Sequence, residues 1–386
     1  MLKSFTWKHP TEIIFGAGCL EQLGEAVGRY GKRVLLVTTG NQGKTSWVYD
    51  KAKAILDREG ITWQHFDQVK PNPVTEIVTA GAQMAKAMDA QVIIGIGGGS
   101  SMDTAKAIAV EASHPGTAWD YLHYKTQPTK STLPVIAVST TSGTGSQVTQ
   151  CAVITHTATK DKSAIWNENI FPKIAIVDPQ LMTSVPKHVT AATGFDAFAH
   201  NFEAYISTGS NAYVQALALR GMELIIHGLP QVLDDLENTD KRSFMAWADT
   251  LGGLAISSGG VTLPHGVGMQ ISGHCPQVSH GLSLSVMYPE FTRFTYTSAI
   301  PEFARVGRMF NHELYQVPDE EAARRCCDEI DGFIKKIGMW TTFKQLGVSD
   351  KDIRQIADCA HVLGDYKNNP KIAEIDQVYE MMVRRR

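Results

Sequence analysis

Four side chains in the second half of the chain are of the types that bind a divalent metal ion. Asp196 and His200 stand four residues apart in a segment with helical periodicity, which places both on one helix face. His265 and His280 each precede a glycine. Three imidazole nitrogens and one carboxylate oxygen suit Fe(II) or Zn(II), and a coordination position left open to a substrate would make the site catalytic. A single histidine is more often a hydrogen-bonded core or cap residue, so most of the 13 histidines are expected to be structural or exposed.

A glycine-rich segment in the first half has the order of elements that a phosphate site requires. Residues 94–106, IGIGGGSSMDTAK, contain a strand end, a glycine turn and a helix start. Glycines let the backbone approach a pyrophosphate, and the free N–H groups and dipole of the following helix attract the anion. A tight turn that binds nothing is the alternative for such a pattern taken alone. The residues expected to contact the cofactor here are Gly97, Gly98, Gly99, Ser100, Ser101 and Asp103.

A second loop of small residues, STTSGTGS at 139–146, follows the next predicted strand. Loops at the carboxyl ends of parallel strands converge on the ligand. We therefore expect the hydroxyl groups of Thr140, Thr141 and Thr144 to face the cofactor. A polar turn into a hairpin is the alternative interpretation.

The end of the first predicted strand bears on the choice between NAD and NADP. The stretch TTGN, residues 38–41, contains no Asp or Glu that would accept a hydrogen bond from a ribose 2′-hydroxyl. Without such a carboxylate, the usual repulsion of a 2′-phosphate is missing, which favours NADP. Thr39, at the end of the strand, is expected to contact the dinucleotide. Lys44 either pairs with that phosphate or is a solvated side chain.

Two domains are expected from the periodicity of the chain. Up to Pro186, short β-branched runs alternate with amphipathic stretches, which indicates a parallel sheet with crossover helices. Beyond Pro186, helical periodicity dominates, as in 214–226 and 320–337. We predict a dinucleotide-binding α/β domain over residues 1–186 and a helical metal-binding domain over 187–386. The predicted strands are 33–38, 62–66, 92–96, 133–139 and 174–177, with helices at 46–58, 75–89 and 102–112 and a hairpin within 147–165.

The bulk composition excludes several classes of protein. Of the 386 residues, 43% are hydrophobic and 19% are charged, an ordinary globular balance. A net charge of −3 supplies no basic field for nucleic acid. The start of the chain resembles no signal peptide, and no apolar run approaches the roughly 20 residues of a membrane span. Six cysteines without a CxxC pair fit reduced thiols, so a cytoplasmic location without membrane attachment is expected.

Taken in order, the motifs resemble the iron-containing, or group III, alcohol dehydrogenases over nearly the whole chain. They are FGAG at 15–18, PNP at 71–73, GGGSSMDTAK at 97–106, TTSGTGS at 140–146, FPK at 171–173, VDP at 177–179, TGFD at 193–196, SHG at 279–281 and NP at 369–370.

The resemblance implies a dehydroquinate-synthase-like N-terminal α/β domain with a parallel sheet, an all-α C-terminal domain, and a metal in the cleft between them. It also implies metal ligation by Asp196, His200, His265 and His280, and an assembly of at least two subunits. The cofactor contacts that it implies are Gly98, Gly99, Ser100, Thr140, Thr141, Thr149 and Lys162.

Two positions depart from the pattern of the family. Many members have Glu where this chain has Gln147, and many have a second histidine, near the nicotinamide, where this chain has Met269. The absence of that histidine puts a histidine proton relay in doubt. His274 either substitutes for it or packs, and the choice of His265 over His274 as a ligand depends on the Leu-Pro-His-Gly context.

The predicted function is a metal-dependent alcohol dehydrogenase or aldehyde reductase that transfers hydride between a small alcohol or aldehyde and NAD(P). Fe(II) is the expected metal, with Zn(II) as the alternative. One alternative on the same scaffold is a hydroxyacid–oxoacid transhydrogenase. Another is an enzyme like glycerol dehydrogenase or dehydroquinate synthase, and enzymes of this second kind typically bind their metal with three protein ligands. A non-catalytic dinucleotide sensor with a structural metal is the alternative from another class.

Overall fold

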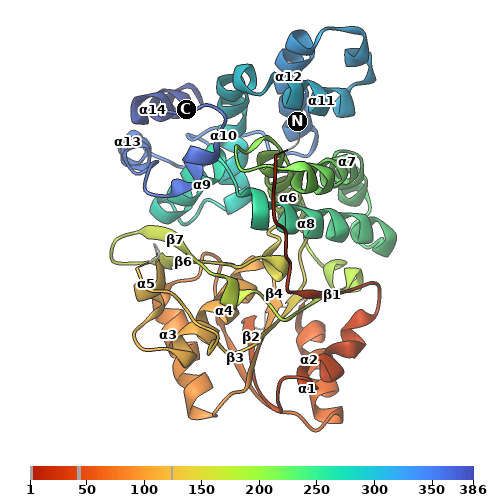
Figure 1. Cartoon of the computed structure of the whole chain (residues 1–386), viewed down its shortest axis with the longest axis vertical. Helices are drawn as coiled ribbons and strands as arrows, with labels where there is room; N and C mark the ends of the chain where they lie inside the picture. Colours follow the sequence, from red (N-terminus) through yellow and green to blue (C-terminus); the bar gives the residue numbers. More distant parts are fainter. Residues whose placement is uncertain (1–2, 41–44, 123–124) are drawn as a thin grey trace. The chain divides into compact units, whose positions relative to one another are not determined.

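In the computed structural model, which describes residues 3–40, 45–122 and 125–386, the chain forms two units. The α/β unit comprises Lys8–Pro186 and Leu236–Ala246. The helical unit comprises the described residues up to Trp7, together with Lys187–Asp235 and Trp247–Arg386. Figure 1 follows the chain through both units by colour.

A parallel sheet of six strands forms the centre of the α/β unit, in the order β1-β8-β5-β4-β2-β3. Its strands are β1 (Glu12–Phe15), β2 (Arg33–Thr39), β3 (Thr62–Val69), β4 (Val92–Gly97), β5 (Val135–Ser139) and β8 (Ile174–Val177). A separate antiparallel hairpin joins β6 (Cys151–His156) to β7 (Asp161–Trp166). The predicted parallel sheet and hairpin are confirmed.

Helices cover both faces of this sheet, because successive side chains of a strand point to opposite sides. On β2, Val34 and Leu36 belong to a buried cluster with residues of α1 and α2. Leu35 and Val37 belong to a second cluster, with residues of α3, α4 and α5. Figure 1 shows α1 and α2 on one side of the strands and α3 on the other. The helices of this unit are α1 (Leu23–Gly28), α2 (Ser46–Arg58), α3 (Thr75–Ala87), α4 (Gly99–Ser113) and α5 (Ala118–Tyr121).

The edge strand β1 is absent from the sequence-based prediction. Its four residues pair with β8, but none of them is fully buried, so the strand lacks the apolar run that marks β2 or β4. Counting β1, the glycine-rich turn follows the fourth strand of the sheet in chain order, where the sequence predicted the third.

Nine helices form the described part of the helical unit, apart from short 3₁₀ turns, and α8 belongs to it from Trp247 onward. They are α6 (Lys187–Ile206), α7 (Ala212–Asp234), α8 (Thr239–Gly259), α9 (Leu263–His274), α10 (His280–Thr295), α11 (Ile300–Phe310), α12 (Asp319–Lys336), α13 (Asp350–Asp358) and α14 (Ile375–Arg384).

Aromatic side chains pack helix α6 into the centre of this unit. Phe198 and Phe202 of α6 are fully buried, and their rings lie 5.8 Å apart. Phe202 contacts Phe303 of α11 edge to face at 5.2 Å, and Phe195 meets Tyr288 of α10 at 5.0 Å. Such ring pairs stabilise a core beyond the apolar area they bury. The packing therefore fixes α6 and α10 against each other.

A glycine lets the first turn of α10 lie against the backbone of α6. A Cβ atom at Gly281 would stand 2.3 Å from the carbonyl oxygen of Ala192. No side chain fits at that distance without a shift of backbone. The glycine that follows His280 thus serves the approach of two helices.

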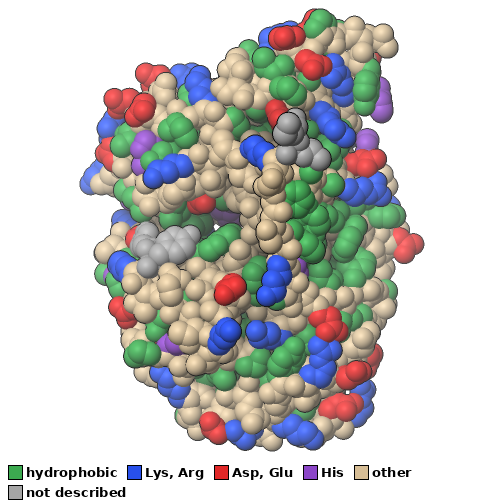
Figure 2. All heavy atoms as spheres, viewed as in Figure 1, with side chains coloured by type: hydrophobic (Ala, Val, Ile, Leu, Met, Phe, Trp, Pro, Cys, Tyr) green, Lys and Arg blue, Asp and Glu red, His purple; other side chains and the backbone are tan. Residues whose placement is uncertain are grey.

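On the face drawn in Figure 2, the described residues form no patch of a single charge sign. Figure 2 shows basic and acidic side chains interspersed over the visible face, in agreement with the net charge of −3. None of the described helices combines the length and the apolar character that crossing a membrane requires.

We predict that Gly281→Ala lowers the free energy of unfolding of the chain by about 1–3 kcal/mol, because the methyl group overpacks the α6–α10 contact. Gly332→Ala is the matched control, since a Cβ at this position in α12 meets no atom within 4 Å. The control should raise stability by roughly 0.5–1 kcal/mol, the usual gain of Ala over Gly in a helix. Thermal unfolding measures the stability of both variants. Equal melting temperatures for Gly281→Ala and Gly332→Ala would contradict the argument that Gly281 is closely packed.

Candidate active site

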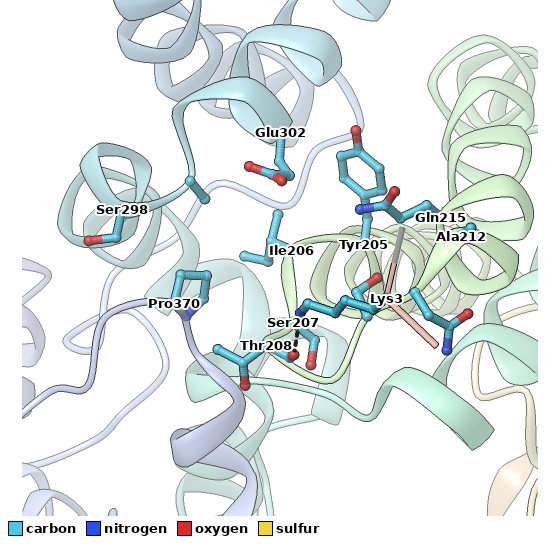
Figure 3. Close-up of a pocket in the computed structure, with 13 residues that line it drawn as sticks. Lys3, Tyr205, Ile206, Ser207, Thr208, Ala212, Gln215, Ser298, Glu302 and Pro370 are labelled. Carbon is cyan, nitrogen blue, oxygen red and sulfur yellow. Dashed lines mark hydrogen bonds between the residues drawn. The ribbon is translucent and has the colours of Figure 1, made fainter. Parts of the chain in front are cut away.

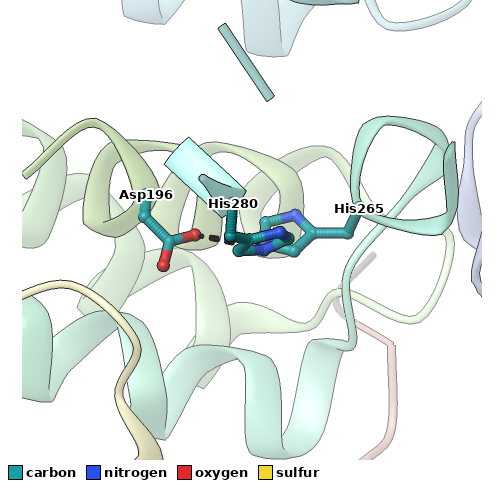
Figure 4. Close-up of side chains that lie close together, drawn as sticks. All are labelled: Asp196, His265 and His280. Atoms are coloured by element: carbon teal, nitrogen blue, oxygen red, sulfur yellow. Dashed lines mark ion pairs between the residues drawn. The ribbon is translucent and has the colours of Figure 1, made fainter. Parts of the chain in front are cut away.

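The side chains of Asp196, His265 and His280 converge on one point in the helical unit (Figure 4). They come from α6, α9 and α10, and their ligand atoms lie within 4.8 Å of one another. Asp196 Oδ1 lies 3.4 Å from His265 Nε2 and 3.7 Å from His280 Nε2. Asp196 and His265 are buried, and His280 is partly exposed. Three of the four predicted metal-ligating residues therefore form one cluster.

These donors fit a divalent metal ion. Ligand atoms roughly 2.1 Å from a tetrahedral ion lie about 3.4 Å apart, which is close to the observed separations. Asp196 Oδ1 and His265 Nε2 are buried, and neither atom makes a hydrogen bond among the described residues. Buried polar atoms of this kind call for a partner. The cluster is a site for a divalent ion.

His200 lies beside the cluster. Its Nε2 is 3.8 Å from Asp196 Oδ1, and its ring stacks on that of His265 with centroids 4.6 Å apart. The four-residue spacing on α6 accounts for its place on the same helix face as Asp196. It is the candidate for a fourth ligand.

Burial and neighbouring charges shift the pKa values of Asp196 and His265 in opposite directions. Burial raises the pKa of Asp196, but the neighbouring imidazoles, led by His200, outweigh it and lower that pKa to about 2. Burial lowers the pKa of His265, whereas the carboxylates of Glu203 and Asp196 raise it to about 10. At neutral pH these pKa values favour an ionised Asp196 carboxylate and a His265 ring with protons on both nitrogens in the metal-free protein.

Glu203 and Tyr288 belong to the surroundings of the site, although the sequence reasoning gave them no role. Glu203 is fully buried and accepts a hydrogen bond from His265 Nδ1 at 2.8 Å. Tyr288 Oη donates to the same carboxylate at 3.1 Å. The sequence feature that could have indicated Glu203 is its position on the predicted helix, seven residues after Asp196 and three after His200, between the apolar residues Phe202 and Ala204.

The predicted phosphate turn joins β4 to α4 in the α/β unit. Gly97 has a φ of +151°, and a Cβ there would stand 2.3 Å from Ser101 Oγ, so only glycine suits the position. A Cβ at Gly99 would meet the Thr144 side chain at 2.7 Å. The turn and the second small-residue loop are therefore packed closely together. With an N-terminal helix turn behind it, the loop has the form that binds phosphates.

A buried lysine on α4 holds the second loop in place. Lys106 is fully buried, and its Nζ donates to Ser146 O at 2.7 Å, to Thr149 Oγ1 at 3.3 Å and to Cys151 O at 2.7 Å. Asp103 accepts from Ser146 Oγ at 2.6 Å and from the Val153 N–H at 3.0 Å. Both oxygens of Asp103 thus accept hydrogen bonds from within the unit, and its contact with the cofactor stays a prediction.

The other predicted cofactor residues of this unit lie as follows. Thr140 donates its N–H to Gly97 O at 2.9 Å, which links the two loops. Lys162, buried on β7, donates to Asn72 Oδ1 at 2.8 Å. Thr39 ends β2, and its Oγ1 lies 2.9 Å from Tyr49 Oη. Lys44 lies outside the described residues.

His274, the candidate for proton transfer, and Met269 both lie on α9. His274 stands in its last turn, where a ring nitrogen donates to the Gln270 carbonyl at 3.0 Å. Met269, at the position where the family resemblance implies a histidine, is buried one turn beyond His265.

A separate pocket of about 390 Å³ opens in the helical unit near the C-terminal end of α6 (Figure 3). Glu302 lines it, and Lys3 Nζ donates there to the Thr208 carbonyl at 3.0 Å. None of the four predicted metal ligands lines this pocket, so it is distinct from the metal site.

We predict that the metal-free chain binds Co(II) more tightly as the pH rises from 6 to 9. Because the pKa of His265 is about 10, a bound ion must displace its proton throughout this range. One displaced proton corresponds to about a tenfold gain in affinity per pH unit. Calorimetric titration in buffers of different ionisation enthalpy counts the released proton. An affinity that does not change with pH would show that binding displaces no proton in this range and would contradict the prediction. His114→Gln, in the α/β unit, is the control that should change nothing.

Comparisons with known proteins agree with both halves of this description. The family model "Iron-containing alcohol dehydrogenase" matches residues 10–179, and the model of the C-terminal domain of the Fe-containing alcohol dehydrogenase family matches residues 190–385. An NAD-dependent methanol dehydrogenase of Bacillus methanolicus is 32% identical, with 97% of each chain covered. A 1,3-propanediol dehydrogenase of Klebsiella pneumoniae is 31% identical, with 96% of this chain and 95% of the relative covered.

A solved structure extends this likeness to the whole fold. The crystal structure of an archaeal halo-thermophilic alcohol dehydrogenase from a Red Sea brine pool matches with a TM-score of 0.95, at 31% identity and full coverage of both chains. Together with the metal site on Asp196, His265 and His280, these matches identify an NAD(P)-dependent oxidoreductase that acts on CH–OH groups. The chain belongs to the iron-containing alcohol dehydrogenase family.

Proposed function

We propose that the chain interconverts a small alcohol and its aldehyde with NAD(H) or NADP(H), using one Fe(II) ion held by Asp196, His200, His265 and His280. The convergence of three imidazoles on Asp196 Oδ1 carries the proposal. No thiolate takes part in this set of nitrogen and oxygen donors, which suits Fe(II), with Zn(II) as the alternative.

Each of the protein's groups has a separate task in this reaction. A divalent ion, when bound, supplies Lewis acidity toward the alcohol or carbonyl oxygen. Asp196 contributes the negative charge that retains the ion, and the imidazoles contribute neutral nitrogen donors. Gly97, Gly98, Gly99 and Ser100 bind the pyrophosphate at the first turn of α4, because the first N–H groups of a helix lack partners within it. Lys106 keeps the second loop against that turn.

His274 remains our candidate for moving the proton that leaves the alcohol. The Gln270 carbonyl accepts a hydrogen bond from its Nδ1, which fixes the tautomer in which Nε2 is free to accept a proton. Position 269, where the family resemblance implies a histidine, is Met in this chain, and a thioether cannot relay a proton.

The proposal also holds that the chain forms a homo-oligomer and acts in the cytoplasm. Light scattering of the purified protein tests the number of subunits. The alternative functions predict different assay results. A transhydrogenase on the same scaffold turns over without added nucleotide, whereas a dinucleotide sensor, which is not an enzyme, does not reduce nicotinamide.

We predict that His280→Ala abolishes the alcohol-dependent reduction of NAD⁺ while the chain stays folded. His280 is partly exposed at the first turn of α10, so its removal costs little packing. Elemental analysis of anaerobically purified protein should find one iron per wild-type chain and a deficit in the variant. The assay uses a panel of alcohols and aldehydes with each cofactor and without added nucleotide. An unchanged rate in His280→Ala would refute the ligand assignment.

We predict that the wild-type chain uses NADP⁺ as well as NAD⁺, because β2 ends at Thr39 without a carboxylate. Thr39→Asp should lower kcat/KM for NADP⁺ by at least about tenfold and leave that for NAD⁺ nearly unchanged, since only the 2′-phosphate meets the new charge. Thr39→Asn is the uncharged control and should leave both values nearly unchanged. A wild-type enzyme that is inactive with NADP⁺ would overturn this part of the proposal.

A further inference from the structure

We propose that Glu203 is a positioning residue of the metal centre, which acts on the bound ion through His265. The inference rests on the proposed function only in so far as Asp196, His265 and His280 bind a divalent ion. Glu203 is not placed as a ligand itself, since it contacts Nδ1 of the His265 ring and Nε2 faces Asp196.

The Glu203 carboxylate is fully buried, and both of its oxygens are occupied by donors. Oε1 accepts from His265 Nδ1 at 2.8 Å and from Tyr288 Oη at 3.1 Å. Oε2 accepts from the N–H of Thr262 at 2.8 Å and from its hydroxyl at 3.1 Å. A buried carboxylate with four donors is a fixed point of negative charge.

These contacts join the three helices that carry the metal ligands. Glu203 lies on α6, on the same face as Asp196 and His200. Thr262 is the N-cap residue of α9, and its hydroxyl donates to Glu203 and does not cap its own helix. Tyr288 lies on α10, two turns after His280. One carboxylate thus orders α9 and α10 against α6 at the level of the metal site.

The bond to His265 has a chemical consequence as well. Because Nδ1 donates to Glu203, the other ring nitrogen, Nε2, is directed toward Asp196 Oδ1 and can act as the ligand atom. A carboxylate behind a ligating imidazole raises its basicity and fixes its orientation, and removal of such a partner typically costs 10–100-fold in metal affinity.

The competing interpretation is that Glu203 only stabilises the packing of the helices. The two interpretations differ in what Tyr288→Phe does. This variant removes one of the four hydrogen bonds that the Glu203 carboxylate accepts and leaves the bond from His265 in place. A role through His265 predicts a metal affinity near that of the wild type, whereas a purely structural role predicts a loss like that of Glu203→Gln.

The test is Co(II) binding to the metal-free full-length protein, measured by chelator competition and by the visible absorption of bound Co(II). Glu203→Gln keeps the shape of the side chain but removes the charge. We expect it to weaken Co(II) binding by about 10–100-fold and to change the absorption spectrum. We expect Tyr288→Phe to stay within about threefold of the wild type, a change well below that loss.

Glu111→Gln is the matched control, because Glu111 is a buried carboxylate of the α/β unit that accepts the Ala118 N–H at 2.7 Å. It should leave Co(II) binding unchanged. Glu203→Gln with wild-type affinity and spectrum would overturn the proposal, as would an equal loss in Tyr288→Phe. If Glu203→Gln does not fold, the Tyr288→Phe result decides. If the wild-type chain binds no Co(II), the metal site itself fails, which is a separate outcome.

Discussion

A buried negative charge on Asp196 is the constraint on which the helical unit depends. The residue is 3% exposed, and its Oδ1 has imidazole nitrogens of three histidines within 3.8 Å. An ionised carboxylate in such a place is stable only when opposite charge compensates it. In the metal-free protein the carboxylates of Glu203 and Asp196 raise the pKa of His265 to about 10, which favours the imidazolium form as the compensating charge. A divalent ion, when bound, would supply positive charge in its place. Metal binding therefore exchanges one form of compensation for another.

The helices around this charge must be held to a fraction of an ångström, because a metal site tolerates little error in ligand position. Phe198 and Phe202 fix α6 in the aromatic core, and Gly281 lets α10 lie directly on the α6 backbone. In the α/β unit, Lys106 has the corresponding task for the two nucleotide loops. In both units, rigid elements behind the site determine its geometry.

Local patterns explain what could be predicted from the sequence. Asp196 and His200 were predictable because they lie one helix turn apart, and the phosphate turn because its glycines directly follow a buried strand. His265 and His280 were assigned with the help of the family resemblance, since they lie 15 positions apart on two different helices. The strand β1 was missed because its residues are only partly buried at the edge of the sheet.

Glu203 was missed because its role arises from Thr262, His265 and Tyr288, which reach it only through the packing of three helices. No spacing in the sequence indicates such a contact. The preference for NADP rested on a missing carboxylate after β2. The similar proteins gave it no support, and the methanol dehydrogenase is described as NAD-dependent.

Anomalous diffraction at the iron absorption edge, from crystals of anaerobically purified protein, tests the central claim most directly. The account predicts one strong peak per chain, within about 2.3 Å of an Asp196 oxygen and of a nitrogen of His265 and of His280. A peak elsewhere, or side chains at this place that point away from a common centre, would contradict it.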